Sequence, residues 1–364
     1  DEGETMKAAV LEAFGKPLSI QDVPPPILGT GEVIVDVFAA PILSYAREVF
    51  SGERKYLLPP PVIPGCGAIG RVRETGPDAA WLKPGDWVFC DPTVRSRDNA
   101  QSPEIVLQGW SARGEGGQKI QQYHLNGSFA EQIRVPTENA LPIGNIDPAD
   151  ASAWCAINTL LVAYGGLLAM ELKAGENVLV SGATGNFGSS AVLAAIAMGA
   201  SKVIAPGRNP QVLQDLRKRF GSRIETVTLS GMADKDISAI KSAAGGPIDA
   251  VLDLLPPSAE ASAARNAIMS VRPYGRAVLM GGVGMLGGDD LALPYPWIMR
   301  NLITIKGQWM YEHEAVYTLV GLIRAGLLDL SHYAVTEFTL SEINHAIIHA
   351  AENSGPFKLT VVRP

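Results

Sequence analysis

The sequence has few cysteines and no excess of basic residues, and each shortage excludes a class of protein. Its three cysteines, Cys66, Cys90 and Cys155, are an odd number without a Cys-x-x-Cys pair, so no disulfide framework is expected. Lysine and arginine total 30 against 37 aspartates and glutamates, and no basic run is dense enough to follow a phosphate backbone. We therefore expect no nucleic-acid partner, and the unpaired thiols favour a reducing, cytoplasmic location.

Signals for export or membrane insertion are also missing, with one segment to explain. The N-terminus lacks the basic-then-apolar order of a secretory signal. Residues 151–170 are uncharged and are about as long as a membrane span, but they include Ser152, Asn158, Thr159 and two glycines. This composition favours a buried helix, so no membrane partner is expected.

What the sequence does contain is typical of a compact α/β enzyme. Its 364 residues are 47% hydrophobic and 18% charged, with 38 glycines and 26 prolines, and they suffice for two domains. Over the first part of the chain, short apolar runs separated by Gly/Pro turns predict a β-rich domain. A polar stretch over residues 91–127 interrupts it, and a loop of that length is usually functional or an extra lobe.

From residue 174 the pattern changes to apolar strands that alternate with helices. Six segments read as strands: ENVLVSG, KVIAPG, ETVTLS, IDAVLDLLP, GRAVLMGG and LITIKGQ. Strands separated by helices of this length predict parallel βαβ units in a doubly wound Rossmann sheet, so the fold class is α/β. The chain then returns to mixed helix and strand and ends with the strand FKLTVVR.

A glycine-rich loop joins the first of these strands to its helix in VLVSGATGNFGSSA. Small residues there let the chain turn sharply, bring the backbone close to a pyrophosphate and pack the helix on the strand. The free N–H groups of the helix N-terminus then face the phosphates. The loop predicts a dinucleotide site, and the residues expected to contact it are Gly182, Thr184, Gly185, Asn186, Phe187 and Gly188.

The end of the second strand bears on which dinucleotide is bound. An NAD-preferring site usually has Asp or Glu here, to bond the ribose 2′-hydroxyl. This chain has Gly207 followed by Arg208, and a guanidinium is suited to a 2′-phosphate. We therefore predict NADP(H) as the cofactor, although Arg208 is also compatible with a solvated loop.

The order of these parts resembles the medium-chain dehydrogenase/reductase superfamily, which includes zinc alcohol dehydrogenases and quinone or enoyl reductases. The resemblance rests on VIPGCGAIGRV, LKPGDWV, GSFAEQIRVP, GATGNFG, LITIKG and FKLTVV, and it covers nearly the whole chain. It implies a GroES-like catalytic domain formed by residues 1–156 and 310–364, around a Rossmann domain of residues 157–309. It also implies an active site in the cleft between them, with a small-molecule substrate.

The positions that hold zinc in this superfamily carry different residues here. The resemblance aligns the three catalytic zinc ligands with Leu43, Cys66 and Cys155, and two thiols with an aliphatic side chain do not complete a site. The lobe that often holds a structural zinc through four cysteines has none. The chain therefore resembles the zinc-independent branch, with no metal and with these three residues lining the substrate cleft. Weak metal binding by Cys66 and Cys155 stays open.

The same resemblance assigns candidate catalytic residues. Tyr45 aligns with the hydroxyl residue that relays protons, Glu48 with the next relay position, and Thr159 with a residue near the nicotinamide carboxamide. Lys358 aligns with a basic residue that approaches the cofactor pyrophosphate, and Asp253 ends the fourth Rossmann strand near the adenosine. Each has an alternative: a core aromatic for Tyr45, a solvated or structural polar group for the others.

In the long lobe, His124 and Trp110 are further candidates for the border of the substrate cleft or for an oligomer contact. Cys90 reads as a packed thiol within a strand.

Together these features predict an NADPH-dependent, zinc-independent oxidoreductase that transfers hydride to an activated C=C or C=O. Candidate substrates are an enone, a quinone, an enoyl thioester or a ketone. Two alternatives remain: a zinc alcohol dehydrogenase that uses Cys66 and Cys155, and a non-catalytic NADPH-binding sensor or partner protein. We expect a homodimer or homotetramer, with residues 281–299 as a candidate interface.

Overall fold

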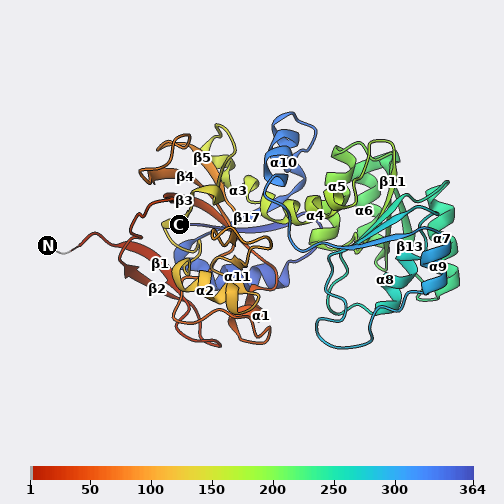
Figure 1. The fold of residues 1–364 in the computed structure, drawn as a ribbon, viewed down its shortest axis with the longest axis horizontal. Coiled ribbons are helices and arrows are strands. Elements are labelled where there is room, and N and C mark those ends of the chain that lie inside the picture. The colour runs from red at the N-terminus through yellow and green to blue at the C-terminus, as the bar shows by residue number, and fades with distance from the viewer. Residues whose placement is uncertain (1–2) are drawn as a thin grey trace. The chain divides into compact units, whose positions relative to one another are not determined.

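The apolar runs of the N-terminal part form strands of one large sheet, together with the end of the chain (Figure 1). The computed structural model describes residues 3–364. The sheet has seven strands in the order β10-β5-β4-β3-β18-β17, with β9 paired to β3. They are β3 (Glu32–Ile42), β4 (Ala68–Thr75), β5 (Trp87–Cys90), β9 (Gln132–Pro136), β10 (Ala140–Pro142), β17 (Ala334–Thr339) and β18 (Lys358–Arg363). Because β18 pairs antiparallel with β3, the last residues of the chain complete the sheet that its early residues begin.

Smaller elements belong to the same part of the molecule. Strand β1 (Met6–Val10) pairs antiparallel with β2 (Ser19–Val23), and the short helix α1 (Ala46–Phe50) follows β3. The polar stretch 91–127 is an ordered lobe with its own small sheet and helix: β6 (Thr93–Arg95), β7 (Ile105–Leu107), β8 (Ser111–Ala112) and α2 (Glu115–Tyr123). Val94, Val106 and Ala112 form the buried core of this lobe, and Ile120 packs against them.

The alternating second part forms the predicted Rossmann sheet. Six parallel strands lie in the order β13-β12-β11-β14-β15-β16, the 3-2-1-4-5-6 order of dinucleotide-binding folds. They are β11 (Asn177–Ser181), β12 (Lys202–Gly207), β13 (Ile224–Thr228), β14 (Ala250–Asp253), β15 (Arg276–Leu279) and β16 (Thr304–Gly307). The prediction of an α/β fold with a Rossmann sheet and a β-rich GroES-like domain is confirmed.

Helices cover both faces of this sheet. In Figure 1, α5 (Asn186–Ala197) and α6 (Pro210–Phe220) lie on one side, and α7 (Ala233–Ala244) and α8 (Ala261–Ile268) lie on the other. Helix α6 begins at Asn209, whose side chain accepts hydrogen bonds from the amides of Gln211 and Val212. The apolar residues of the strands are almost fully buried between these helices, as a two-sided sheet requires.

The contacts divide the chain into two compact units. Unit 1 is the described part of Asp1–Asn158 with Leu330–Ser354 and Lys358–Pro364, and unit 2 is Thr159–Asp329 with Gly355–Phe357. Residues 310–329, expected in the catalytic domain, therefore pack with the Rossmann sheet. Tyr164 of α4 (Ile157–Ala169) explains this, because its hydroxyl donates a 2.8 Å hydrogen bond to Thr318 of α10 (Ala315–Arg324).

The uncharged segment 151–170 forms two helices and not one. Helix α3 (Ala151–Trp154) is followed by Cys155, and α4 begins at Ile157 at 43° to the preceding helical stretch. Within residues 3–364 no single helix meets the length and apolarity of a membrane span, whereas this bent pair does by length and composition. Most of its side chains are buried inside the protein, as the polar residues in the segment predicted.

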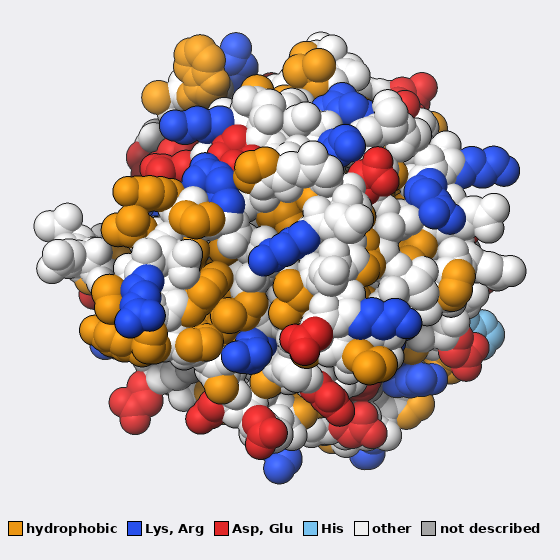
Figure 2. Space-filling model, turned by 90° about the vertical axis from the view of Figure 1, so that its right-hand side faces the viewer, with side chains coloured by type: hydrophobic (Ala, Val, Ile, Leu, Met, Phe, Trp, Pro, Cys, Tyr) orange, Lys and Arg blue, Asp and Glu red, His pale blue; other side chains and the backbone are white. Residues whose placement is uncertain are grey.

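Exposed apolar side chains gather on one surface region. Figure 2, which views the right-hand side of Figure 1, shows them over the left part of that face. In unit 2, the segment 285–302 contributes five exposed side chains: Met285, Leu286, Tyr295, Met299 and Leu302. Its helix α9 (Tyr295–Arg300) packs Trp297 and Ile298 against the core of unit 2. An element with one packed face and an exposed apolar face is typical of a protein interface.

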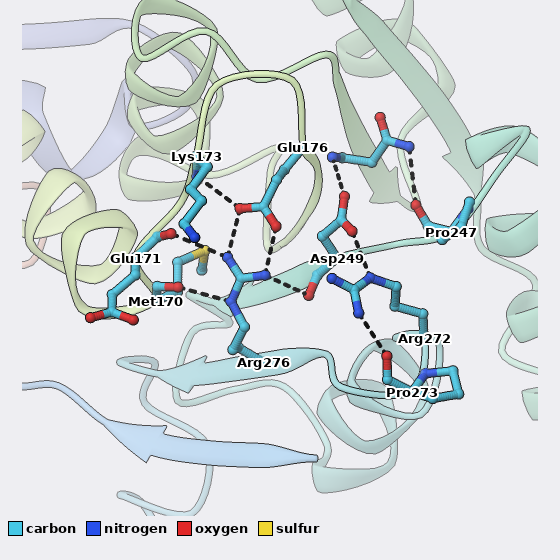
Figure 3. Close-up of polar contacts among 10 residues, drawn as sticks. Met170, Glu171, Lys173, Glu176, Pro247, Asp249, Arg272, Pro273 and Arg276 are labelled. Atoms are coloured by element: carbon cyan, nitrogen blue, oxygen red, sulfur yellow. Dashed lines mark hydrogen bonds and ion pairs between the residues drawn. The ribbon is translucent and has the colours of Figure 1, made fainter. Parts of the chain in front are cut away.

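An ion-pair network fastens the amino ends of three Rossmann strands (Figure 3). The guanidinium of Arg276, which begins β15, makes two 2.7 Å bonds to the carboxylate of Glu176, which precedes β11. It also donates to the carbonyl of Met170 at 2.9 Å. Asp249, which precedes β14, accepts from Arg272 at 2.7 Å. The charged side chains of this network pair with one another. They lie at the amino-end edge of the sheet, opposite the glycine-rich loop, so we assign the network a structural role.

Candidate functional site

The glycine-rich loop has the geometry of a phosphate-binding turn. It leaves β11 at Gly182, whose φ of +90° is a conformation that side chains rarely adopt. A Cβ on Gly188, in the first turn of α5, would overlap the Gly182 carbonyl oxygen. At Gly185, which precedes α5, a Cβ would meet only that same oxygen, at 3.5 Å, so the space beside it is open. This open cradle at the N-terminus of a twelve-residue helix fits a dinucleotide pyrophosphate.

Two loop side chains have distinct surroundings. Thr184 packs against the end of β12, where a Cβ on Gly207 would come within 2.5 Å of its methyl carbon. The Oδ1 atom of Asn186 is buried without a hydrogen-bond partner among the described residues. Phe187 lies beside it in the first turn of α5 and is half-buried. The loop is therefore held against β12 by Thr184, and Asn186 keeps an unused acceptor.

The neighbouring strand ends supply the other predicted cofactor residues. Arg208 follows β12 directly and is exposed. Asp253 ends β14 and is buried, and burial raises its pKa to about 6. Ser181, at the end of β11, and the amide of Leu255 both donate hydrogen bonds to its carboxyl group. Asp253 thus ties the ends of β11 and β14 together, beside the crevice where a doubly wound sheet binds its ligand.

In unit 1, Cys66 lies in a tight turn between two glycines. Gly65 and Gly67 have φ values of +125° and +89°, which explains both glycines. The turn is held by a 3.0 Å bond from the Gly65 amide to the carbonyl of Gly109. Cys66 is buried, and its burial together with the nearby Asp91 carboxylate raises the pKa of the thiol well above its usual value. It is therefore a neutral thiol at pH 7.

Tyr45 lies next to Cys66 in the same unit. It precedes α1 and packs edge to face on Trp110, with ring centroids 5.8 Å apart. Burial, then the neighbouring Tyr56 and Cys66, raise the pKa of the Tyr45 phenol well above 10. The phenol keeps its proton at neutral pH and can donate it.

Glu48 is connected to Tyr45 through a third residue. The Arg54 guanidinium lies over the Tyr45 ring, 4.4 Å from its centroid, and its Nε bonds the Glu48 carboxylate at 2.8 Å. The Glu48 side chain is 48% exposed whereas that of Arg54 is 17% exposed, so the arginine forms the inner side of the pair. The helical spacing of Tyr45 and Glu48 predicted that they lie close together. It did not predict that Arg54 contacts both of them.

Of the three positions that the resemblance aligns with catalytic zinc ligands, two carry a side chain with a donor atom. Leu43 follows β3 and is half-buried, and an aliphatic side chain offers no ligand atom. Cys155 lies between α3 and α4, and burial raises the pKa of its thiol, against the opposing effects of Arg363 and of a hydrogen bond with the Ile69 backbone. Zinc binds thiolates, so a metal at Cys66 and Cys155 would have to displace both thiol protons. Across residues 3–364, no group of three or more His, Cys, Asp and Glu side chains is arranged to hold a metal ion.

The remaining predicted residues take ordinary positions. Thr159 is buried on α4 in unit 2. Lys358 is the exposed first residue of β18 in unit 1. His124 lies at the end of α2, where it lines a separate cavity of unit 1. The catalytic and cofactor roles of Thr159 and Lys358 stay predictions.

Sequence reasoning missed most of the aromatic cluster around Tyr45. Trp110, almost fully buried, packs on Tyr45, Phe50 and Tyr56, with ring centroids 5.7 to 6.4 Å apart. Tyr56 and Phe50 are close to Tyr45 in the chain, but Trp110 comes from the distant lobe. The available signal was aromatic residues recurring over 45–56 and a tryptophan in an otherwise polar lobe.

A Rossmann unit with a phosphate-binding loop, joined to a GroES-like unit, defines the class of two-domain dehydrogenases. Comparison with known families agrees. The zinc-binding dehydrogenase family matches residues 187–325, and the alcohol dehydrogenase GroES-like domain matches residues 29–145.

Individual relatives extend this similarity over most of the chain. An alcohol dehydrogenase from Rhizobium meliloti (strain 1021) is 30% identical over 306 residues, 83% of this chain and 84% of that protein. A zinc-binding dehydrogenase from Sinorhizobium meliloti 1021, solved bound to NADP, shares 21% identity and a TM-score of 0.77, covering 99% of this chain and all of that one. An alcohol dehydrogenase from E. coli CFT073, solved with NADH, shares 18% identity and a TM-score of 0.78 over both full chains.

The chain belongs to the medium-chain zinc-binding dehydrogenase family and is an NAD(P)-dependent oxidoreductase.

Proposed function

We propose that this protein is an NADPH-dependent reductase that transfers hydride to an activated C=C or C=O without zinc. One observation carries the proposal. At the positions that the resemblance aligns with the zinc ligands, this chain has Leu43 and two buried, protonated thiols, and a protonated phenol lies beside one of those thiols. Substrates of this kind are an enone, a quinone, an enoyl thioester or a ketone.

The residues of the two units have separate tasks in this proposal. When bound, the nicotinamide dinucleotide would supply a hydride, that is, a proton with two electrons, to the electrophilic carbon of the substrate. The loop from Gly182 to Gly188 binds its pyrophosphate. In unit 1, Tyr45 donates its phenolic proton to the oxygen or carbon that becomes negative, which yields an alcohol or a saturated carbonyl compound. Arg54, over the Tyr45 ring, favours the transient phenolate, which regains its proton from solvent.

The preference for NADPH rests on the end of β12. No carboxylate stands at Gly207, and the exposed guanidinium of Arg208 follows it. The overall fold does not decide the question, since the two similar structures hold different cofactors.

A zinc-dependent alcohol dehydrogenase is the second candidate, favoured by the activity of the R. meliloti relative. It requires Cys66 and Cys155 to lose their protons to a metal and a further ligand to join them.

Metal analysis combined with a substrate panel tests the proposal. Purified protein, dialysed against a chelator, is assayed for metal content and for NADPH oxidation with enones, quinones, ketones and aldehydes. We expect less than stoichiometric zinc and undiminished turnover of at least one substrate. Stoichiometric zinc, with activity lost on chelation and restored by zinc, would establish the second candidate instead. NADPH binding without turnover of any panel member would favour a sensor or partner protein.

We also propose that two copies of the chain associate through unit 2 as a homodimer, or as a tetramer built from it. Strand β16 ends the Rossmann sheet, and a second copy's β16 would continue its hydrogen bonding. The exposed apolar side chains of residues 285–302 precede this strand in the sequence. The three cysteines are unpaired thiols, which supports the proposed cytoplasmic location.

A further inference from the structure

The cysteine-free lobe over residues 91–127 contacts the turn that carries Cys66. The carbonyl of Gly109, in the lobe, accepts the 3.0 Å hydrogen bond from the Gly65 amide. Gly109 has a φ of +73°, and a Cβ there would overlap the Gly65 carbonyl oxygen. The backbone of the lobe therefore lies as close to the Cys66 turn as the absence of a side chain allows.

The lobe also holds the loop that follows α1. The carbonyl of Leu57 in this loop accepts a 3.0 Å bond from the Ala112 amide and a 2.8 Å bond from the Gln121 side chain. Trp110 comes directly after Gly109 and two residues before Ala112. Its backbone is thus held on both sides by hydrogen bonds that join the lobe to the rest of unit 1.

The Trp110 ring is the centre of the aromatic cluster beside Tyr45. It is 2% exposed, and its centroid lies 5.8 Å from that of Tyr45 with 70° between the ring planes. Phe50 and Tyr56 pack on it with the same edge-to-face geometry, which is the favourable arrangement for aromatic pairs. A ring held by its backbone and by two further rings gives Tyr45 a fixed surface to pack on.

One polar atom of this ring has no partner of its own. The Nε1 atom of Trp110 is buried without a hydrogen-bond partner among residues 3–364, and such donors are rare in folded proteins. Trp110 nevertheless acts on the Tyr45 hydroxyl through this N–H, because it lowers the pKa of the phenol. A phenolate accepts a hydrogen bond much more strongly than a phenol, so the N–H gains a partner when Tyr45 loses its proton.

The other groups around the Tyr45 hydroxyl show why a donor is needed there. Burial, Tyr56 and Cys66 raise the pKa of Tyr45, so the surroundings as a whole oppose the phenolate. Trp110 and, less strongly, Arg54 have the opposite effect. The phenolate is therefore favoured by one indole N–H from the lobe and by one guanidinium.

We propose that Trp110 is a positioning residue for Tyr45, which fixes the phenol ring and donates its indole N–H to the phenolate oxygen that forms during proton transfer. The inference rests on the proposed function, in which Tyr45 is the proton donor. In that step the O–H bond of Tyr45 breaks, and an O–H or C–H bond forms on the substrate. The electron pair of the broken bond stays on the Tyr45 oxygen, beside the indole, until solvent returns a proton.

A fluorinated tyrosine at position 45 of the full-length protein tests the inference without turnover. Fluorination lowers the pKa of a phenol, which brings its ionisation into a range that ultraviolet absorbance can follow. We expect Trp110→Phe to raise the pKa of this phenol by about one unit, because the substitution removes the donor. Trp87→Phe, the same substitution at a buried tryptophan that packs on Phe38, is the matched control and should leave the pKa unchanged.

The direction of the change separates the donor from the packing. A gap left by the smaller ring in Trp110→Phe would admit water, and hydration of the phenolate would lower the pKa of the phenol. A lowered or unchanged pKa in Trp110→Phe would therefore overturn the inference.

Kinetics with an isosteric ring give a second test, which does not depend on how well Trp110→Phe folds. Benzothienylalanine at position 110 keeps the shape of tryptophan and has sulfur in place of the indole N–H. We expect kcat with the best panel substrate to fall about tenfold, with an unchanged KM for NADPH. Wild-type kcat in this protein would overturn the inference.

Failure of the proposed function gives a different result. A wild type that turns over no panel substrate would overturn the proposed function, whereas the pKa of the fluorinated phenol would still show whether Trp110 stabilises the phenolate.

Discussion

Tyr45 is the residue whose removal most directly changes the proposed chemistry. Tyr45→Phe keeps the ring against Trp110 and Arg54 but removes the proton donor, so we expect kcat to fall about a hundredfold. The KM for NADPH should stay constant, because Tyr45 belongs to unit 1 and the phosphate-binding loop to unit 2. Steady-state kinetics with the best panel substrate measure both. Tyr56→Phe, the control, removes the hydroxyl of another tyrosine that packs on Trp110, and it should retain the wild-type kcat. Full activity in Tyr45→Phe would exclude Tyr45 as the proton donor.

Arg208 decides the cofactor preference in our proposal. Removing its guanidinium leaves the 2′-phosphate without a charge-assisted partner, so Arg208→Ala should raise the KM for NADPH about tenfold. The KM for NADH should hardly change. Lys218→Ala, an exposed cation on α6, is the matched control. An unchanged NADPH-to-NADH preference in Arg208→Ala would remove this assignment.

Asp253 makes stability depend on pH. Its folded-state pKa of about 6 lies above the ordinary 3.8, so between these values the folded protein binds more protons than the unfolded chain. Its contribution to stability is therefore full below about pH 4 and is lost as the pH rises through about 6. Asp253→Asn keeps an acceptor for Ser181 and Leu255 and removes the titration.

We expect Asp253→Asn to be more stable than the wild type above about pH 6, by up to about 3 kcal/mol, and equally stable near pH 4. Urea unfolding of both proteins across this range measures the difference. A difference that does not change with pH would contradict the raised pKa.

At the scale of elements, two glycines at the junction of β11 and α5 have different roles: Gly188 is needed for folding and Gly185 for cofactor binding. Gly188→Ala forces a Cβ into the Gly182 carbonyl, so we expect a loss of several kcal/mol in unfolding free energy. Gly185→Ala meets nothing closer than 3.5 Å and has an ordinary φ of −85°, so the fold should survive.

The added methyl in Gly185→Ala occupies the cradle, however, and should raise the NADPH dissociation constant at least about tenfold. Thermal unfolding and fluorescence titration with NADPH measure the two effects separately. Wild-type affinity in a folded Gly185→Ala protein would mean that the pyrophosphate lies elsewhere.

For the whole molecule, the edge of the Rossmann sheet governs assembly. The amides of Thr304 and Gln308 donate to the carbonyls of Gly275 and Leu279 along β15, so the amides of the alternate residues Ile305 and Gly307 face outward. Gly307→Pro removes one outward donor, and no atom lies within 4 Å of the Cβ position that the substitution fills. We expect a shift from dimer to monomer in light scattering coupled to gel filtration.

Gly307→Ala is the control for this substitution, because it adds a side chain and keeps the amide. It should remain dimeric. A wild type that is already monomeric, or a Gly307→Pro protein that stays dimeric, would refute association through β16.

Much of the fold follows from local patterns that the chain displays in order. Six apolar strands separated by helices, together with the Gly182–Gly188 loop, predict the Rossmann sheet, because periodicity and turn chemistry act over a few residues. The ordered lobe over residues 91–127 was harder to predict, since its strands are two or three residues long and are stabilised only by packing with one another.

The candidate site shows the same division at the level of side chains. The sequence by itself determined the dinucleotide loop, the missing carboxylate at Gly207 and the aliphatic residue at Leu43. Only the tertiary structure decided that Cys66 and Cys155 are neutral, that Arg54 links Tyr45 to Glu48, and that Trp110 packs on Tyr45 from a distant lobe. The physical reason is that protonation depends on desolvation and on charges that the fold brings together, which no local pattern records.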